Sequence, residues 1–82
     1  MITVKFFGLL SVNHDINKIE MEEGKVQDIL TKIIQLYPGI TEKQLKQSIM
    51  IINKKQVSGN KRFVVELEPG DELVFLNSSS GG

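Results

Sequence analysis

The sequence has no cysteine among its 82 residues and no excess of charge, with 10 Lys and Arg against 10 Asp and Glu. The lack of cysteine excludes disulfides, thiolate nucleophiles, and iron–sulfur or zinc–thiolate sites. The charge balance argues against a general binder of nucleic acid or membrane surfaces. No apolar run is long enough to span a bilayer. Residues 1–5 lack the basic region and long apolar stretch of a signal peptide, so we expect a cytoplasmic protein.

Motifs for catalysis are also missing. The sequence shows no Gly-rich phosphate loop, no metal-ligand spacing and no nucleophile–base arrangement. The lone His14 stands in a polar stretch that we interpret as a turn, which does not suggest a metal or catalytic site. We therefore expect no intrinsic enzymatic activity, no bound cofactor and no metal.

The chain has enough apolar residues for one small core, because 40% of its residues are hydrophobic. A chain of this length forms a single domain. Such a domain buries only about 60–65% of its unfolded surface, so we expect modest stability.

Two strands are predicted near the start of the chain. Residues 2–7 alternate cleanly between two faces, which is typical of a strand. Residues 13–15 read as a turn, and residues 16–22 predict a returning strand. Together they predict an N-terminal hairpin.

The clearest helix is predicted over residues 26–37. Six apolar side chains form one helical stripe: Val26, Ile29, Leu30, Ile33, Ile34 and Tyr37. Pro38-Gly39 ends this helix. Its start is poorly capped, because Lys25 stands where Ser, Thr or Asp is preferred, at a cost of about 1 kcal/mol. A short second helix is predicted over residues 42–47, where Thr41 and Gln44 have capping-box spacing.

The second half of the chain predicts more strands. Residues 49–52 and 56–57 flank a turn at residues 53–55, and residues 72–76 follow a type II turn at residues 68–71. The apolar residues 63–67 have no clear assignment. The order of elements predicts an α+β fold, in which a mixed sheet of about five strands packs on one main helix.

The sequence closes on Ser78-Ser79-Ser80-Gly81-Gly82. We expect residues 1–76 to form the domain and residues 77–82 to form a flexible arm. Glycine has no Cβ, so a Gly-Gly end fits a narrow channel. Six extended residues reach at most about 20 Å, which is enough to enter a deep pocket.

This order of elements, together with residues 2–8, 51–53 and 69–75 and the terminal Gly81-Gly82, resembles a known family. It is similar to the ubiquitin-like β-grasp sulfur carriers of the MoaD/ThiS superfamily, especially the small subunit of molybdopterin synthase. The resemblance covers essentially the whole chain. Members of that branch usually carry Pro-Pro before the di-glycine, where this chain has Ser78-Ser79-Ser80.

The resemblance implies a carrier whose chemistry happens at Gly82, with Ser80 and Gly81 in the arm. An E1-like enzyme would use ATP to adenylate the Gly82 carboxylate, and a sulfur donor would convert it to a thiocarboxylate. A large synthase subunit, or another acceptor, would receive the sulfur for molybdopterin synthesis. The chain itself would be a monomer that acts within a heteromer.

Three alternatives to the molybdopterin carrier remain open at this point. The chain could be a thiamine-type sulfur carrier. It could be a ubiquitin-like modifier that is joined to lysines through Gly82. It could also be a plain interaction module with an inert tail.

The family pattern also suggests which side chains of the last strand point toward the core and which point outward. Leu73 and Phe75 would face the core, whereas Val74 and Leu76 would face outward. With Phe7 on the same outer face, the expected docking patch consists of Phe7, Val74 and Leu76.

Two charged groups lie outside that patch. One is basic, and we expect a solvated surface, with steering of acidic partners as the alternative: Lys54, Lys55, Lys61 and Arg62. The other is expected to be a solvated acidic edge, with pairing to basic residues of an activating enzyme as the alternative: Glu66, Glu68, Asp71 and Glu72.

Overall fold

The structure, a computed structural model of the chain, describes residues 1–14 and 16–77. Along the chain the elements are β1 (Ile2–Gly8), α1 (Leu9–His14), β2 (Lys18–Met21), β3 (Gly24–Lys25), α2 (Val26–Leu36), α3 (Glu42–Gln47), β4 (Ile49–Ile52), β5 (Lys55–Val57), the 3-10 helix η1 (Asn60–Val64), β6 (Glu66–Leu67) and β7 (Glu72–Asn77). No helix in the described ranges is long and apolar enough to cross a membrane.

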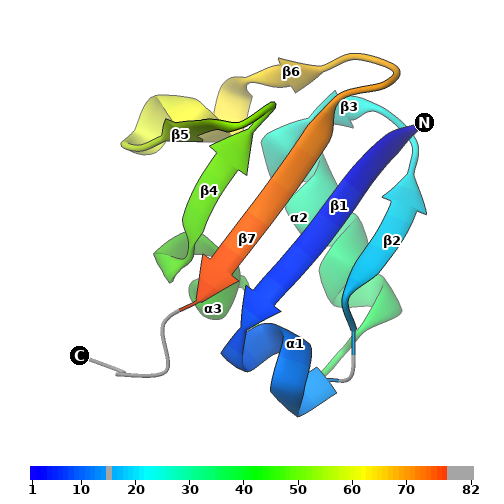
Figure 1. Cartoon of the computed structure of the whole chain (residues 1–82), viewed down its shortest axis with the longest axis vertical. Helices are drawn as coiled ribbons and strands as arrows, with labels where there is room; N and C mark the ends of the chain where they lie inside the picture. The colour runs from blue at the N-terminus through cyan, green and yellow to red at the C-terminus, as the bar shows by residue number, and fades with distance from the viewer. Residues whose placement is uncertain (15, 78–82) are drawn as a thin grey trace.

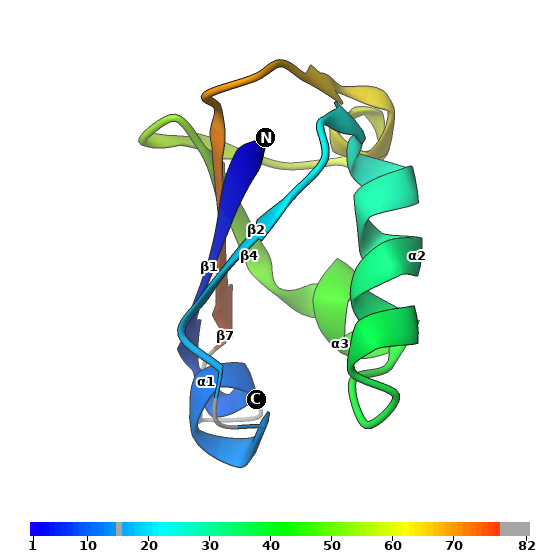
Figure 2. The same cartoon turned by 90° about the vertical axis from the view of Figure 1, so that its right-hand side faces the viewer.

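Five strands form the main sheet in the order β2-β1-β7-β4-β5, as Figure 1 shows. The central strands β1 and β7 are parallel, and the remaining pairs are antiparallel. Figure 2 shows the sheet nearly edge-on, with α2 and α3 on one side and, among the described residues, no helix covering the other. The expected mixed sheet of five strands on one main helix is confirmed.

The core lies between the sheet and α2. Phe6 of β1 and Phe75 of β7 stack with ring centroids 5.6 Å apart, and both are fully buried. From α2, Val26, Ile29 and Ile33 are buried against this layer. The predicted helical stripe is therefore the one that packs on the sheet.

Helix α2 has the weak cap that the sequence predicts. Lys25 at the N-cap makes no side-chain hydrogen bond to the helix. Instead, the Val26 amide donates to the Val65 carbonyl at 3.0 Å. The residue between η1 and β6 thus satisfies an N–H group that has no partner within the helix.

Two local predictions are confirmed in detail. Thr41 and Gln44 form a capping box at the start of α3, with hydrogen bonds of 2.9 and 3.1 Å. In the turn before β7, the Asp71 amide donates to the Glu68 carbonyl at 3.0 Å, and Gly70 has a φ of 92°. That positive φ is what a type II turn requires at its third position.

The segment after β1 differs from the expected hairpin. Helix α1 occupies residues 9–14, and β2 begins only at Lys18 rather than at Ile16. The reason is burial, since Leu10 and Ile16 are 2% and 5% exposed and both join the core. Asp15 and the side chain of His14 lie outside the described residues. Toward the other end, β7 runs one residue further than expected, to Asn77.

Candidate docking surface and arm root

Three exposed apolar side chains line up across the side of the sheet opposite α2. The strand register places Phe7 of β1 beside Leu76 of β7, and Leu76 beside Ile49 of β4. Paired residues project from the same face of a sheet. Phe7 is 51% exposed, and Leu76 and Ile49 are each 39% exposed. We call Phe7, Leu76 and Ile49 the apolar row.

Val74 has a different environment from the one expected for a docking residue. It lies on the same outer face, but it is only 8% exposed. The register places Lys5 on one side of it and Ile51 on the other. A residue in the middle of a central strand is covered by its neighbours on both sides. The exposed patch therefore contains Ile49, which the sequence pattern did not single out, in place of Val74.

The outer face changes from charged to apolar along β7. At the start of the strand, Glu72 forms an ion pair with Lys5, and the Lys5 Nζ and Glu72 Oε2 atoms lie 2.9 Å apart. Lys18 of β2 pairs with Lys5 in the register. The apolar row follows at the other end, next to the point where β7 ends.

Asn77 is the last residue of β7, where the expected arm begins. Its backbone pairs with Gly8 of β1. Gly8 has a φ of 88°, and a Cβ at this position would overlap the Asn77 carbonyl oxygen. On the other side, the Asn77 side-chain amide donates to Ser48 Oγ at 3.3 Å.

The residues for which we expect the chemistry, Ser80, Gly81 and Gly82, lie outside the described residues. Their roles stay predictions. Within residues 1–14 and 16–77, no group of three or more His, Cys, Asp or Glu side chains could hold a metal ion.

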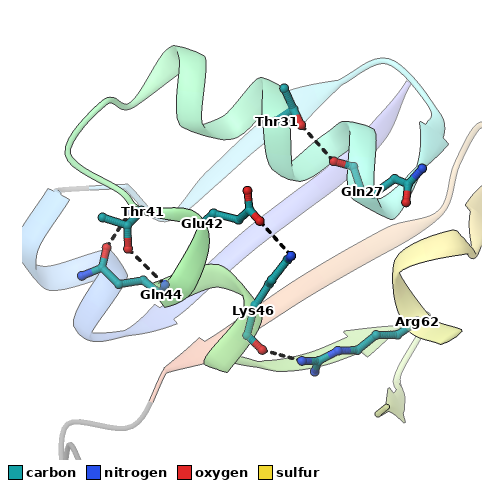
Figure 3. A network of polar contacts seen from close by, with 7 residues as sticks. All are labelled: Gln27, Thr31, Thr41, Glu42, Gln44, Lys46 and Arg62. Carbon is teal, nitrogen blue, oxygen red and sulfur yellow. Dashed lines mark hydrogen bonds and ion pairs between the residues drawn. The ribbon is translucent and has the colours of Figure 1, made fainter. Parts of the chain in front are cut away.

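Arg62 does not belong to a solvated basic surface. Its guanidinium donates to the Lys46 carbonyl, as Figure 3 shows, and to the Ser48 carbonyl at 3.3 Å. The guanidinium also lies over the Phe63 ring, 4.7 Å from its centroid. Arg62 therefore satisfies carbonyls at the end of α3. Lys54, Lys55 and Lys61 are exposed, as expected.

The acidic edge likewise contains one residue with a structural role. Asp71 accepts hydrogen bonds from the Glu68 amide at 2.8 Å and from the Asn53 side chain at 3.0 Å. Both bonds lower the pKa of the Asp71 carboxyl below its usual value, and the bond from the Glu68 amide has the larger effect. The Asn53 oxygen in turn accepts from the Glu72 amide at 2.9 Å. This network ties the β4–β5 turn to the start of β7.

No family model matches this sequence, and no curated protein matches it. Solved structures do match its fold over nearly all of the chain. The small archaeal modifier protein 1 (SAMP1) from Methanosarcina acetivorans superposes with a TM-score of 0.81 at 20% identity, covering 99% of this chain and 95% of that one.

Two solved complexes match as well. The BexX/CysO complex from Amycolatopsis orientalis contains a chain with a TM-score of 0.73 at 23% identity, covering 100% of both chains. The complex of subunits 1 and 2 of the molybdopterin-converting factor from Helicobacter pylori contains one with a TM-score of 0.67 at 18% identity, covering 99% of this chain and 97% of that one. At these identities the likeness shows the fold alone, and the fold is the ubiquitin-like β-grasp.

Proposed function

We propose that this chain is a non-catalytic carrier that acts in the cytoplasm through a free carboxylate at Gly82. The observation that carries the proposal is the geometry at the end of β7. The strand ends at Asn77, directly after Leu76 of the exposed apolar row, and Gly82 follows five residues later. The body can therefore dock through the row while residues 78–82 reach about 17 Å into a partner.

A carboxylate is a poor electrophile, so an activating E1-like enzyme is needed. The Gly82 carboxylate attacks the α-phosphate of ATP, which forms an acyl-adenylate and releases pyrophosphate. A persulfide donor then displaces AMP and forms an acyl disulfide. A second thiol attacks the donor-side sulfur of that disulfide, which leaves the Gly82 thiocarboxylate and a disulfide on the donor. This sulfur is a good nucleophile, and no side chain of the carrier takes part.

For the acceptor, we propose a large synthase subunit that builds the dithiolene of molybdopterin. Support comes from fold likeness to a chain in the complex of subunits 1 and 2 of the molybdopterin-converting factor from Helicobacter pylori, at a TM-score of 0.67. A protein from Pyrococcus furiosus described as molybdopterin-converting factor subunit 1 matches at 0.64. Fold likeness by itself does not select a pathway. A thiamine-type carrier uses the same terminus and is the alternative within this class.

The second candidate function is a protein modifier that is conjugated to lysines through Gly82. The likeness to two SAMP1 structures, with TM-scores of 0.81 and 0.74, favours this candidate, because SAMP1 stands for small archaeal modifier protein 1. The initial activation of Gly82 is the same in both functions. They differ in whether sulfur or a target amine receives the acyl group.

Intact-mass measurement tests the proposal. The chain is incubated with a cognate activating enzyme, ATP and a sulfur source. A carrier gains the mass of one oxygen-to-sulfur exchange, and fragmentation assigns it to Gly82. A modifier instead appears in heavier adducts that survive thiol reduction. An unchanged mass with every cognate enzyme contradicts both.

The matched control is the same chain extended by one residue beyond Gly82. The extension leaves the β-grasp body and the apolar row intact but removes the Gly82 carboxylate. We expect no mass change in the extended chain. Sulfur gain without prior trimming of the extra residue would contradict a mechanism that uses the terminus.

A further inference from the structure

Ser48 is the one buried polar side chain in the described part of the chain, at 2% exposure. It stands at the C-cap of α3, a position from which a serine can face water. A buried hydroxyl requires hydrogen-bond partners, and this one has two. It donates to the Gln44 carbonyl at 2.8 Å and accepts from the Asn77 side chain at 3.3 Å.

Gly8 holds Asn77 from the other side. The backbones approach so closely that a Cβ on residue 8 would overlap the Asn77 carbonyl oxygen. The φ of 88° at Gly8 also suits glycine rather than an L side chain. Two residues thus contact Asn77, the last residue of β7. Gly8 allows the close approach because it has no side chain, and Ser48 accepts a hydrogen bond through its buried hydroxyl.

Ser48 is itself held in place by η1 and α3. Arg62 donates to the Ser48 and Lys46 carbonyls, and Figure 3 shows its guanidinium reaching the end of α3. Lys46 also pairs with Glu42 one turn earlier, at 2.7 Å. Ser48 is therefore a fixed point against which Asn77 is positioned.

From this geometry we infer that Gly8, Ser48 and Asn77 form an arm-root clamp that sets where residues 78–82 leave the sheet. The last residues of a strand are normally the first to open. Phe7 and Leu76 of the apolar row directly precede Gly8 and Asn77 in the chain, so the clamp also fixes the arm relative to the row. The inference rests on the proposed function in one respect, because a fixed arm root matters only if Gly82 must reach a partner's active site.

Ser48→Ala removes the hydroxyl to which the side chain of the half-buried Asn77 donates. Hydrogen exchange measures the result without any partner. The amides of Leu76 and Asn77 should exchange about 2- to 10-fold faster, the factor that one neutral hydrogen bond supports. Amides of Leu30 and Ile33 in α2 should keep their rates. Unchanged exchange at Leu76 and Asn77 overturns the clamp.

Ser11→Ala is the matched control. Ser11 donates to Asn17 at 2.7 Å, so the variant removes another serine–asparagine hydrogen bond without touching β7. It should leave exchange at Leu76 and Asn77 unchanged. Equal acceleration in both variants also overturns the clamp, because it would reflect a general loosening.

The activating enzyme supplies a second readout. The carrier is the enzyme's substrate, so an unfolded fraction lowers its effective concentration and raises KM. A misdirected arm instead slows the step after docking. We expect Ser48→Ala to lower kcat for Gly82 adenylation about 2- to 10-fold with KM nearly unchanged. Faster exchange with unaltered kcat overturns the positioning role. If the wild-type chain is never adenylated, the proposed function fails, and the exchange result still decides the clamp.

Discussion

The two faces of the sheet carry similar side chains in two neighbouring rows, yet the rows have opposite environments. The inner row consists of Phe6, Phe75 and Met50, each 0% exposed. The apolar row consists of their chain neighbours Phe7, Leu76 and Ile49, which are 39–51% exposed. The same three strands, β1, β7 and β4, supply both rows.

The difference lies in what covers each face. Successive residues of a strand point to opposite faces, so a shift of one residue moves a side chain from one environment to the other. Helix α2 covers the inner row, whereas no helix within residues 1–14 and 16–77 covers the outer face in Figure 2. Burial of a large apolar side chain stabilises a fold by roughly 1.5–3 kcal/mol. The inner row therefore stabilises the domain, whereas the apolar row stays exposed, as the proposed docking surface requires.

The largest expected effect is on the inner row. Phe75→Ala removes a ring that is fully buried and stacked on Phe6. We expect a loss of about 3–5 kcal/mol in the free energy of unfolding, measured by urea denaturation. Leu76→Ala, one residue along, is the matched change on the outer face and should cost less than about 1 kcal/mol. Equal losses at the two positions would contradict the comparison.

The next effect is on binding rather than folding. Phe7→Asp places a charge in the proposed docking surface, where burial against a partner would be unfavourable. We expect KM for the activating enzyme to rise about 10-fold or more, with the free energy of unfolding changed by less than about 1 kcal/mol. Val12→Asp is the control, because Val12 on α1 is 79% exposed and lies off the apolar row. A similar rise in KM for both variants would remove the special role of the row.

A smaller effect is expected at the charged end of the outer face. Lys5→Met breaks the ion pair with Glu72, in which the two side chains are 37% and 29% exposed. Such a pair contributes about 0.2–1 kcal/mol at low ionic strength. The difference in the free energy of unfolding between this variant and the wild type should be smaller in 1 M salt, because the salt screens the charges. A loss that is independent of salt would indicate packing by the lysine stem instead.

The smallest expected effect is a dependence of stability on pH, which arises from Asp71 near the start of β7. Hydrogen bonds from the Glu68 amide and the Asn53 side chain lower the pKa of Asp71 in the folded state. The ionised form is therefore favoured by folding, and its contribution is complete above about pH 4. It is lost as the pH falls through the lowered pKa. Asp71→Asn should flatten the stability profile in that acid range, as followed by thermal unfolding at several pH values, and an unchanged slope would contradict this assignment.

Local signals in the sequence predicted the elements well where the pattern was strong. The apolar stripe from Val26 predicted α2, the Thr41–Gln44 spacing predicted the capping box, and Gly70 marked the turn before β7. Each of these signals acts over a few residues, so no distant partner is needed to read it.

Other features depend on contacts between distant segments. Helix α1 forms where Leu10 and Ile16 can enter the core, and the burial of Val74 depends on strands β1 and β4 at its sides. The exposed Ile49 joins the apolar row through its register with Leu76. The sequence alone contains no signal for these pairings, because each involves residues far apart in the chain.

The sequence by itself determined the class of fold and the main helix, and it suggested the chemistry that we propose at Gly82. Periodicity, turn residues and the glycine end are local properties, and they act at short range. Only the tertiary structure decided which apolar residues stay exposed and how Gly8, Ser48 and Asn77 meet at the arm root. Exposure and clamping both follow from strand register and helix placement, which exist only once the chain has folded.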